Sequence, residues 1–185
     1  MIRLEQITDK PEMGAKATLD RPLDNLVACH RRIEERLEIL ERAAVHLGDR
    51  RDEAMETIEN CFRFLDSNGM WHTADEEESI FPRLQGRLNQ TDAQFLQSLE
   101  AEHREADGLY GRLKELHAGL AAAVPGTSEG LIEDFGDVVR RLCEIYRRHI
   151  AAEDAHLIGI ARAGLDESQL SEISREMKIR RGLNS

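Results

Sequence analysis

The chain has 185 residues, a length that suits one domain with short flanking segments. Its 36 acidic and 25 basic side chains give a formal net charge of −11 at pH 7, which argues against binding to nucleic acid or to an anionic membrane. Aromatic residues make up only 4% of the chain, fewer than a β-sandwich or β-barrel normally uses, and no apolar run approaches the roughly 18 residues of a membrane span. The beginning of the chain lacks the apolar stretch of a signal peptide, and the three cysteines are widely spaced, so we expect a cytoplasmic protein with reduced thiols.

After a mixed stretch that we interpret as an arm, apolar residues recur in steps of three and four, the spacing of an amphipathic helix. The predicted helices cover approximately residues 22–47, 50–81, 91–123, 128–164 and 168–178. In the second of them, Ser67, Asn68 and Gly69 interrupt the pattern without changing its phase, which predicts a kink within one element. We expect that element to end near Pro82, because proline disfavours a helical conformation in the residue before it.

Four long helices with short connections predict an all-α fold, an antiparallel up-down-up-down four-helix bundle with a short C-terminal fifth helix. The expected domain organisation has three parts. Residues 1–20 form an N-terminal arm, residues 21–165 form the bundle, and residues 166–185 form the C-terminal helix and tail.

One histidine lies on the apolar stripe of each long helix: His30, His72, His103 and His149. At 1.5 Å per residue, each lies roughly 12 to 21 Å from the same end of an up-down bundle. The four imidazoles are therefore predicted to meet in one region of the interior.

Two glutamates strengthen this pattern, because Glu76 follows His72 and Glu153 follows His149 by four residues, which places each pair on one helix face. The two halves of the chain also resemble a repeat, since 77 residues separate the two histidines and 77 separate the two glutamates. Unpaired buried carboxylates would cost several kcal/mol each, and bound cations remove that cost. Imidazole and carboxylate suit iron, zinc or manganese, so we predict a binuclear site in which both glutamates bridge and each metal keeps open positions.

Four other side chains are candidates for a role behind the ligands. Glu34 follows His30 by four residues, and Asp107 follows His103 by four residues. Tyr146 lies one turn before His149, and His156 lies two turns after it. Surface exposure or ordinary packing is the alternative for each. Three acidic neighbours are expected on a solvated face, although one could orient an imidazole through its second nitrogen: Glu77, Glu78 and Asp154.

The segments CHRRIEERL around His30, HTADEEESIFP from His72, EHREADGLYGRL around His103 and RRHIAAEDAHL around His149 resemble the hemerythrin-like, His-His-Glu cation-binding domains. The resemblance covers about residues 22–181. It implies a four-helix bundle that holds a non-haem di-iron centre, two iron ions with a bridging oxo or hydroxo group.

The ligand pattern differs from that of the oxygen-carrying hemerythrins, which have a second histidine where this chain has Asp107 and an HxxxxD pair where this chain has Glu153. It is more similar to the di-iron proteins that repair nitrosative damage, although those carry an additional cysteine-containing N-terminal domain that we do not expect here. The resemblance implies a protein that binds or senses O₂ or NO, or that handles reactive oxygen or nitrogen species.

Two alternatives stay open, a di-iron enzyme of the peroxidase or catalase type and an iron-handling protein without catalysis. The expected partner is a small gaseous or peroxide ligand, with no nucleic acid and no membrane. The sequence does not identify a protein partner.

Overall fold

The structure is a computed structural model that describes residues 19–124 and 127–183. Most of the predicted arm, residues 1–20, therefore lies outside the described residues. Within the described ranges the chain is helical and contains no strand. The elements, with η marking a π-helical turn, are α2 (Pro22–Val45), α3 (Arg51–Phe64), η2 (Leu65–Gly69), α4 (Met70–Ala74), η3 (Asp75–Ile80), α5 (Phe81–Gln85), α6 (Gln90–Ala122), α7 (Glu129–Ala152), η4 (Glu153–Leu157), α8 (Ile158–Gly164) and α9 (Glu167–Arg180).

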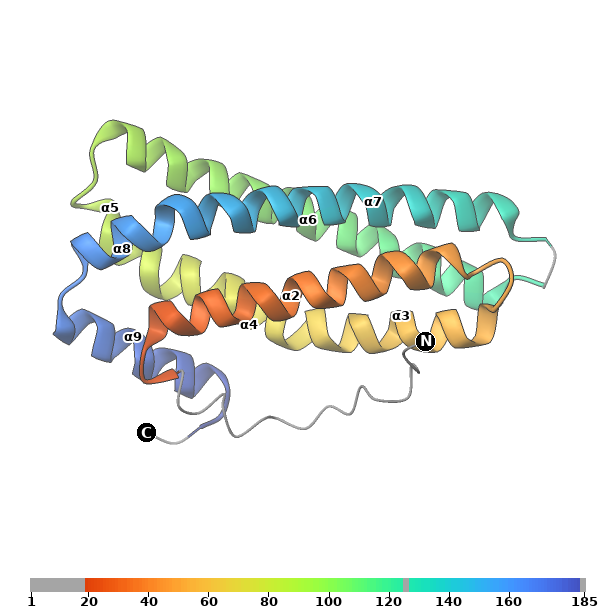
Figure 1. The fold of residues 1–185 in the computed structure, drawn as a ribbon, viewed down its shortest axis with the longest axis horizontal. Helices are drawn as coiled ribbons and strands as arrows, with labels where there is room; N and C mark the ends of the chain where they lie inside the picture. The colour runs from red at the N-terminus through yellow and green to blue at the C-terminus, as the bar shows by residue number, and fades with distance from the viewer. Residues whose placement is uncertain (1–18, 125–126, 184–185) are drawn as a thin grey trace.

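These elements form four long rods and one short helix (Figure 1). The rods are α2, the series from α3 to α5, α6, and the series from α7 to α8. Helix α2 packs against α3 and against α7, and α6 packs against α7. Side-chain contacts join the second rod to α6, among them the edge-to-face rings of Phe62 and Tyr110. Helix α9 lies alongside the bundle near one end, against η3 and the beginning of α2 (Figure 1). The predicted all-α bundle with a short C-terminal helix is confirmed.

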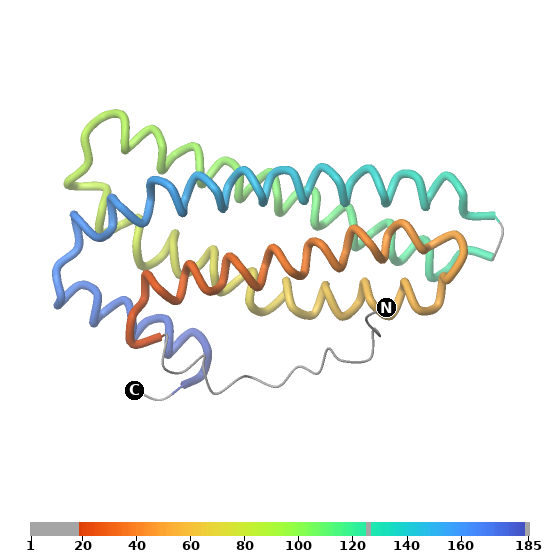
Figure 2. The backbone as a smooth tube through the Cα atoms, viewed as in Figure 1, coloured from red at the N-terminus to blue at the C-terminus, as the bar shows by residue number. Residues whose placement is uncertain are grey.

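The second rod continues through the predicted interruption without a reversal of direction, as the backbone tube shows (Figure 2). The π turn η2 occupies the place where Ser67 to Gly69 interrupt the apolar pattern. The predicted end of this rod near Pro82 is wrong, because α5 carries the helix on to Gln85. Pro82 lies in the first turn of α5, directly after the π turn η3, a position where its missing N–H and fixed φ are tolerated.

The core consists of two apolar clusters with a polar layer between them. On α2, Leu26 belongs to the cluster near α9 and Ile33 to the cluster at the opposite half of the bundle, with His30 between them. On α6, Leu99 and Ala106 bracket the layer in the same way. The bundle therefore holds a group of buried polar side chains away from both of its ends. No helix in the described part of the chain is long and apolar enough to cross a membrane.

Candidate metal centre

The polar layer contains the six residues that the sequence indicates as metal ligands, and each of the four rods contributes at least one of them. All are buried, with at most 6% of the residue surface exposed. They are His30 on α2, His72 on α4, Glu76 on η3, His103 on α6, His149 on α7 and Glu153 on η4. The structure thus brings together side chains that are up to 123 residues apart in sequence (153 − 30).

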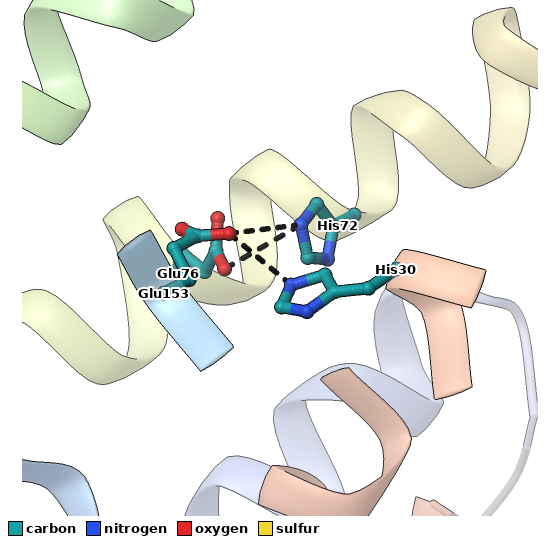
Figure 3. A group of neighbouring side chains, drawn as sticks. All are labelled: His30, His72, Glu76 and Glu153. Atoms are coloured by element: carbon teal, nitrogen blue, oxygen red, sulfur yellow. Dashed lines mark ion pairs between the residues drawn. The ribbon is translucent and has the colours of Figure 1, made fainter. Parts of the chain in front are cut away.

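One half of the layer is formed by His30, His72, Glu76 and Glu153, whose nearest donor atoms all lie within 4.8 Å of one another (Figure 3). The His30 Nε2 atom is 3.1 Å from Glu153 Oε2, and the His72 Nε2 atom is 3.5 Å from Glu76 Oε1. The two imidazole rings meet edge to face, with their centroids 4.8 Å apart. Two imidazole nitrogens and two carboxylates therefore face a common point.

The other half uses the same two glutamates with His103 and His149, again with donor atoms within 4.8 Å of one another. The His103 Nε2 atom is 3.4 Å from Glu76 Oε2, and the His149 Nε2 atom is 3.1 Å from Glu153 Oε1. Each carboxylate thus directs one oxygen towards each half. The arrangement suits two cations, each with two imidazoles, and with both carboxylates bridging between them.

The donor atoms of this layer are poorly satisfied by protein alone. Both oxygens of Glu76, both oxygens of Glu153 and the Nε2 atoms of all four histidines are buried without a hydrogen-bond partner among the described residues. Buried polar atoms in this state are costly, and native proteins normally pair them. Cations would satisfy all of them at once, and nitrogen and oxygen donors of this kind suit first-row metals. The residues therefore fit a binuclear cation site.

Local backbone structure helps to place the two glutamates. Glu76 lies in the π turn η3 and Glu153 in the π turn η4, at equivalent places in the two halves of the chain. A π turn adds a residue to the helical turn and is frequent at functional sites. The predicted repeat of 77 residues is thus accompanied by a repeated irregularity of the backbone.

Three of the four imidazoles have a carboxylate on their second nitrogen. Such a carboxylate keeps the proton on Nδ1 and leaves the Nε2 lone pair directed at the cation. No carboxylate of the described residues lies on Nδ1 of His72, whereas the buried thiol of Cys29 is close enough to act on the pKa of that histidine. The pairs, with their Nδ1-to-oxygen distances, are His30–Asp154 at 2.7 Å, His103–Glu77 at 2.8 Å and His149–Glu102 at 3.0 Å.

The electrostatics of the layer follow from burial and from the crowding of charge. Burial and the neighbouring Glu153 carboxylate raise the pKa of Glu76. Burial would also raise the pKa of Glu153, but the surrounding imidazoles, His149 first among them, outweigh it and hold that pKa well below its usual range. Burial lowers the pKa of His103, yet its contacts with Glu76 dominate and raise that pKa to about 9. Protons and cations therefore compete for the same donor atoms.

The four candidates for a role behind the ligands lie in different places. Glu34 pairs with Arg31, which also pairs with Asp154, so Glu34 connects to the layer only through those two residues. Asp107 is exposed. Tyr146 packs against the larger apolar cluster, where burial raises its pKa to about 12.

His156 is directed away from the layer. It is exposed, its Nε2 atom lies 2.9 Å from Asp92 Oδ1, and its ring packs against Phe95. This histidine lies in η4, and its contacts lie on α6, towards the end of the bundle.

The carboxylates that do contact the imidazoles are Asp154, Glu77 and Glu102. The first two were expected on a solvated face, with an orienting role as the alternative, and the structure favours that alternative. Glu102 was not considered. The sequence did carry a signal for all three, since Asp154 and Glu77 directly follow the two buried glutamates and Glu102 directly precedes His103.

The chain matches the family model described as the hemerythrin HHE cation binding domain over residues 21–161. No curated protein matches the chain. The matched segment contains all six residues of the buried His and Glu layer and the four rods of the bundle except for the last three residues of α8. Together with the two groups of cation-binding type in the interior, this match shows that the chain belongs to the hemerythrin HHE cation-binding domain family.

Proposed function

We propose that this protein holds two iron ions with a bridging oxo or hydroxo group in its buried His and Glu layer, and that it binds or senses O₂ or NO, or handles reactive oxygen or nitrogen species. The observation that carries the proposal is the pair of four-residue groups that share both glutamates. Two imidazoles and two shared carboxylates at each position leave coordination sites for a small ligand. A bound iron pair would supply one-electron redox chemistry next to those sites.

The residues of the chain have separate roles in this proposal. Each histidine would bind through Nε2 as the neutral imidazole, while Glu76 and Glu153 would bridge. The carboxylates of Asp154, Glu77 and Glu102 hold three of the rings in place and keep a proton on Nδ1. The apolar clusters on both sides exclude bulk water and strengthen these interactions.

The small size of the layer and the net charge of −11 favour a small gaseous or peroxide partner over nucleic acid or a membrane surface, and we propose a cytoplasmic location. Enzymatic turnover of peroxide is the competing possibility.

Anaerobic loading with Fe²⁺, followed by exposure to air, tests the site. We expect metal analysis to find about two irons per chain and the absorbance spectrum to show a near-UV oxo-to-iron band. His72→Ala and Glu153→Ala should lose the band while far-UV circular dichroism keeps its helical signal. His46→Ala is the matched control, because the His46 side chain is 41% exposed and pairs with Asp49 near the far end of α2.

Protein that binds no iron under these conditions, or variants of the layer that keep the full band, would overturn the proposal. Separate additions of O₂, NO and hydrogen peroxide to the loaded protein then distinguish the ligands by their spectral changes. Sustained consumption of peroxide would identify an enzyme, whereas a single reversible spectral change would identify a binding or sensing protein.

A further inference from the structure

The C-terminal helix α9 lies outside the segment that matches the family model, yet it reaches the π turn that carries Glu76. Asp75, the residue before Glu76, is completely buried, a position that a carboxylate occupies only when it is paired. Both of its partners come from the end of α9. Arg180 donates to Oδ1, and Arg181 donates to both oxygens, at 3.1 Å from Oδ1 and 2.6 Å from Oδ2.

Arg181 makes a second contact on the same rod. Its guanidinium lies over the ring of Trp71, 5.4 Å from the centroid, and Trp71 directly precedes His72. The end of α9 therefore contacts two residues that directly precede predicted ligands. Trp71 precedes His72, and Asp75 precedes Glu76. Arg180 also pairs with Glu78, the second residue after Glu76.

Helix α9 is itself well anchored. It begins with a capping box in which Asp166 and Gln169 satisfy each other's backbone N–H groups. Ile173 and Met177, both fully buried, insert into the apolar cluster at this end of the bundle. Helix α9 thus presents its two arginines from a fixed position.

We propose that α9 is a positioning element for the cation site, in which Arg180 and Arg181 hold Asp75 and thereby set the π turn that directs Glu76 towards both halves of the layer. The proposal rests on cation binding by that layer and not on which metal or gas is used. Docking of α9 and cation binding must then be coupled in both directions, because each favours the same arrangement of the turn.

The test uses Arg180→Ala/Arg181→Ala in the full chain, with Co²⁺ as the probe. The matched control is Lys178→Ala, which removes an ion pair between α9 and Asp20 but leaves the Asp75 contacts in place. Trp71 is the single tryptophan of the chain, so its emission in the cation-free protein reports whether the end of α9 has left its place.

In the double variant we expect the Trp71 emission to shift and the Co²⁺ affinity to fall about 10–100-fold, the usual effect of losing support behind a metal ligand. The visible spectrum of bound Co²⁺ should also change, since Glu76 would bind in a different geometry, and an element that only stabilised the fold would leave this spectrum unchanged. Lys178→Ala should stay within about twofold of the wild type in affinity, as expected for an exposed ion pair.

Three results would overturn the proposal: unchanged Trp71 emission in the double variant, a Co²⁺ affinity and spectrum like those of the wild type, or an equal loss in Lys178→Ala. Hydrogen exchange in the wild-type protein gives a measurement that requires no variant to fold. Adding Co²⁺ should slow exchange of the α9 amides, and unchanged exchange there would also contradict the coupling. Wild-type protein that binds no Co²⁺ at all would contradict the cation site itself.

Discussion

Replacing Asp154 with asparagine tests whether the carboxylates behind the imidazoles support one cation position each. Asp154 contacts His30 through a 2.7 Å separation between Oδ1 and Nδ1, and asparagine keeps the shape of the side chain while removing its charge. Loss of such a carboxylate costs about 10–100-fold in metal affinity. The Asp154 side chain is 23% exposed and shares its charge with Arg31, so we expect a loss near the lower limit, about tenfold or 1.4 kcal/mol.

The structure also predicts where this loss occurs. Asp154 contacts His30 in one half of the layer, whereas Glu102 contacts His149 in the other half. Co²⁺ titration followed by absorbance, in competition with a chelator, measures the affinities. In a His72→Ala background, which already disables the first half, Asp154→Asn should cause little further loss.

The comparison variant for this cycle is Glu102→Gln. It should weaken the remaining Co²⁺ position in the His72→Ala background about as strongly as it does in the wild type, because the two changes lie in different halves. An Asp154→Asn effect that is the same in both backgrounds would refute the assignment of one carboxylate to one position.

Three further predictions concern stability. In cation-free protein the pKa of His103 is raised from 6.5 to about 9, so its protonated form stabilises the fold fully below pH 6.5 and this contribution is lost as the pH rises through about 9. Thermal unfolding followed by circular dichroism should therefore show a Tm that falls across that pH range, and the Tm of His103→Gln should depend less on pH. Leu37→Ala, at a fully buried position of α2, should lower the free energy of unfolding in urea by about 2–5 kcal/mol, against less than about 0.5 kcal/mol for the 79% exposed Val45→Ala. Co²⁺ at 100 times Kd should raise the stability by about 2.7 kcal/mol for each position that it occupies, and a chelator should return the Tm to its cation-free value.

The four-helix architecture and the convergence of the six polar residues could be predicted from the sequence because both depend on periodicity. An apolar stripe sets which face of each helix is buried, and the rise per residue sets how far along the bundle each histidine lies. His30 and His103 lie in rods that run in one direction, and His72 and His149 lie in rods that run in the other. The position of each histidine along the bundle axis could therefore be calculated from the lengths of the helices.

The backbone irregularities could not be predicted in the same way. A π turn such as η3 looks helical in sequence, and Pro82 lies in the first turn after it, where the missing N–H of proline is tolerated. A rule that treats proline as the end of a helix considers local preference and not the turn before it. The interruption at Ser67 to Gly69 was interpretable, because the apolar pattern kept its phase on both sides.

The sequence by itself determined the helices, their inward faces and the level at which His and Glu side chains meet, since these follow from spacing along one chain. Only the tertiary structure decided which carboxylate contacts which imidazole, because Glu102 and His149 lie on different helices and their distance depends on how the helices are rotated against each other. It also decided the partners of Asp75, whose charge is paired because α9 folds back along the second rod. Contacts of that kind depend on packing between elements, which no periodicity within one element records.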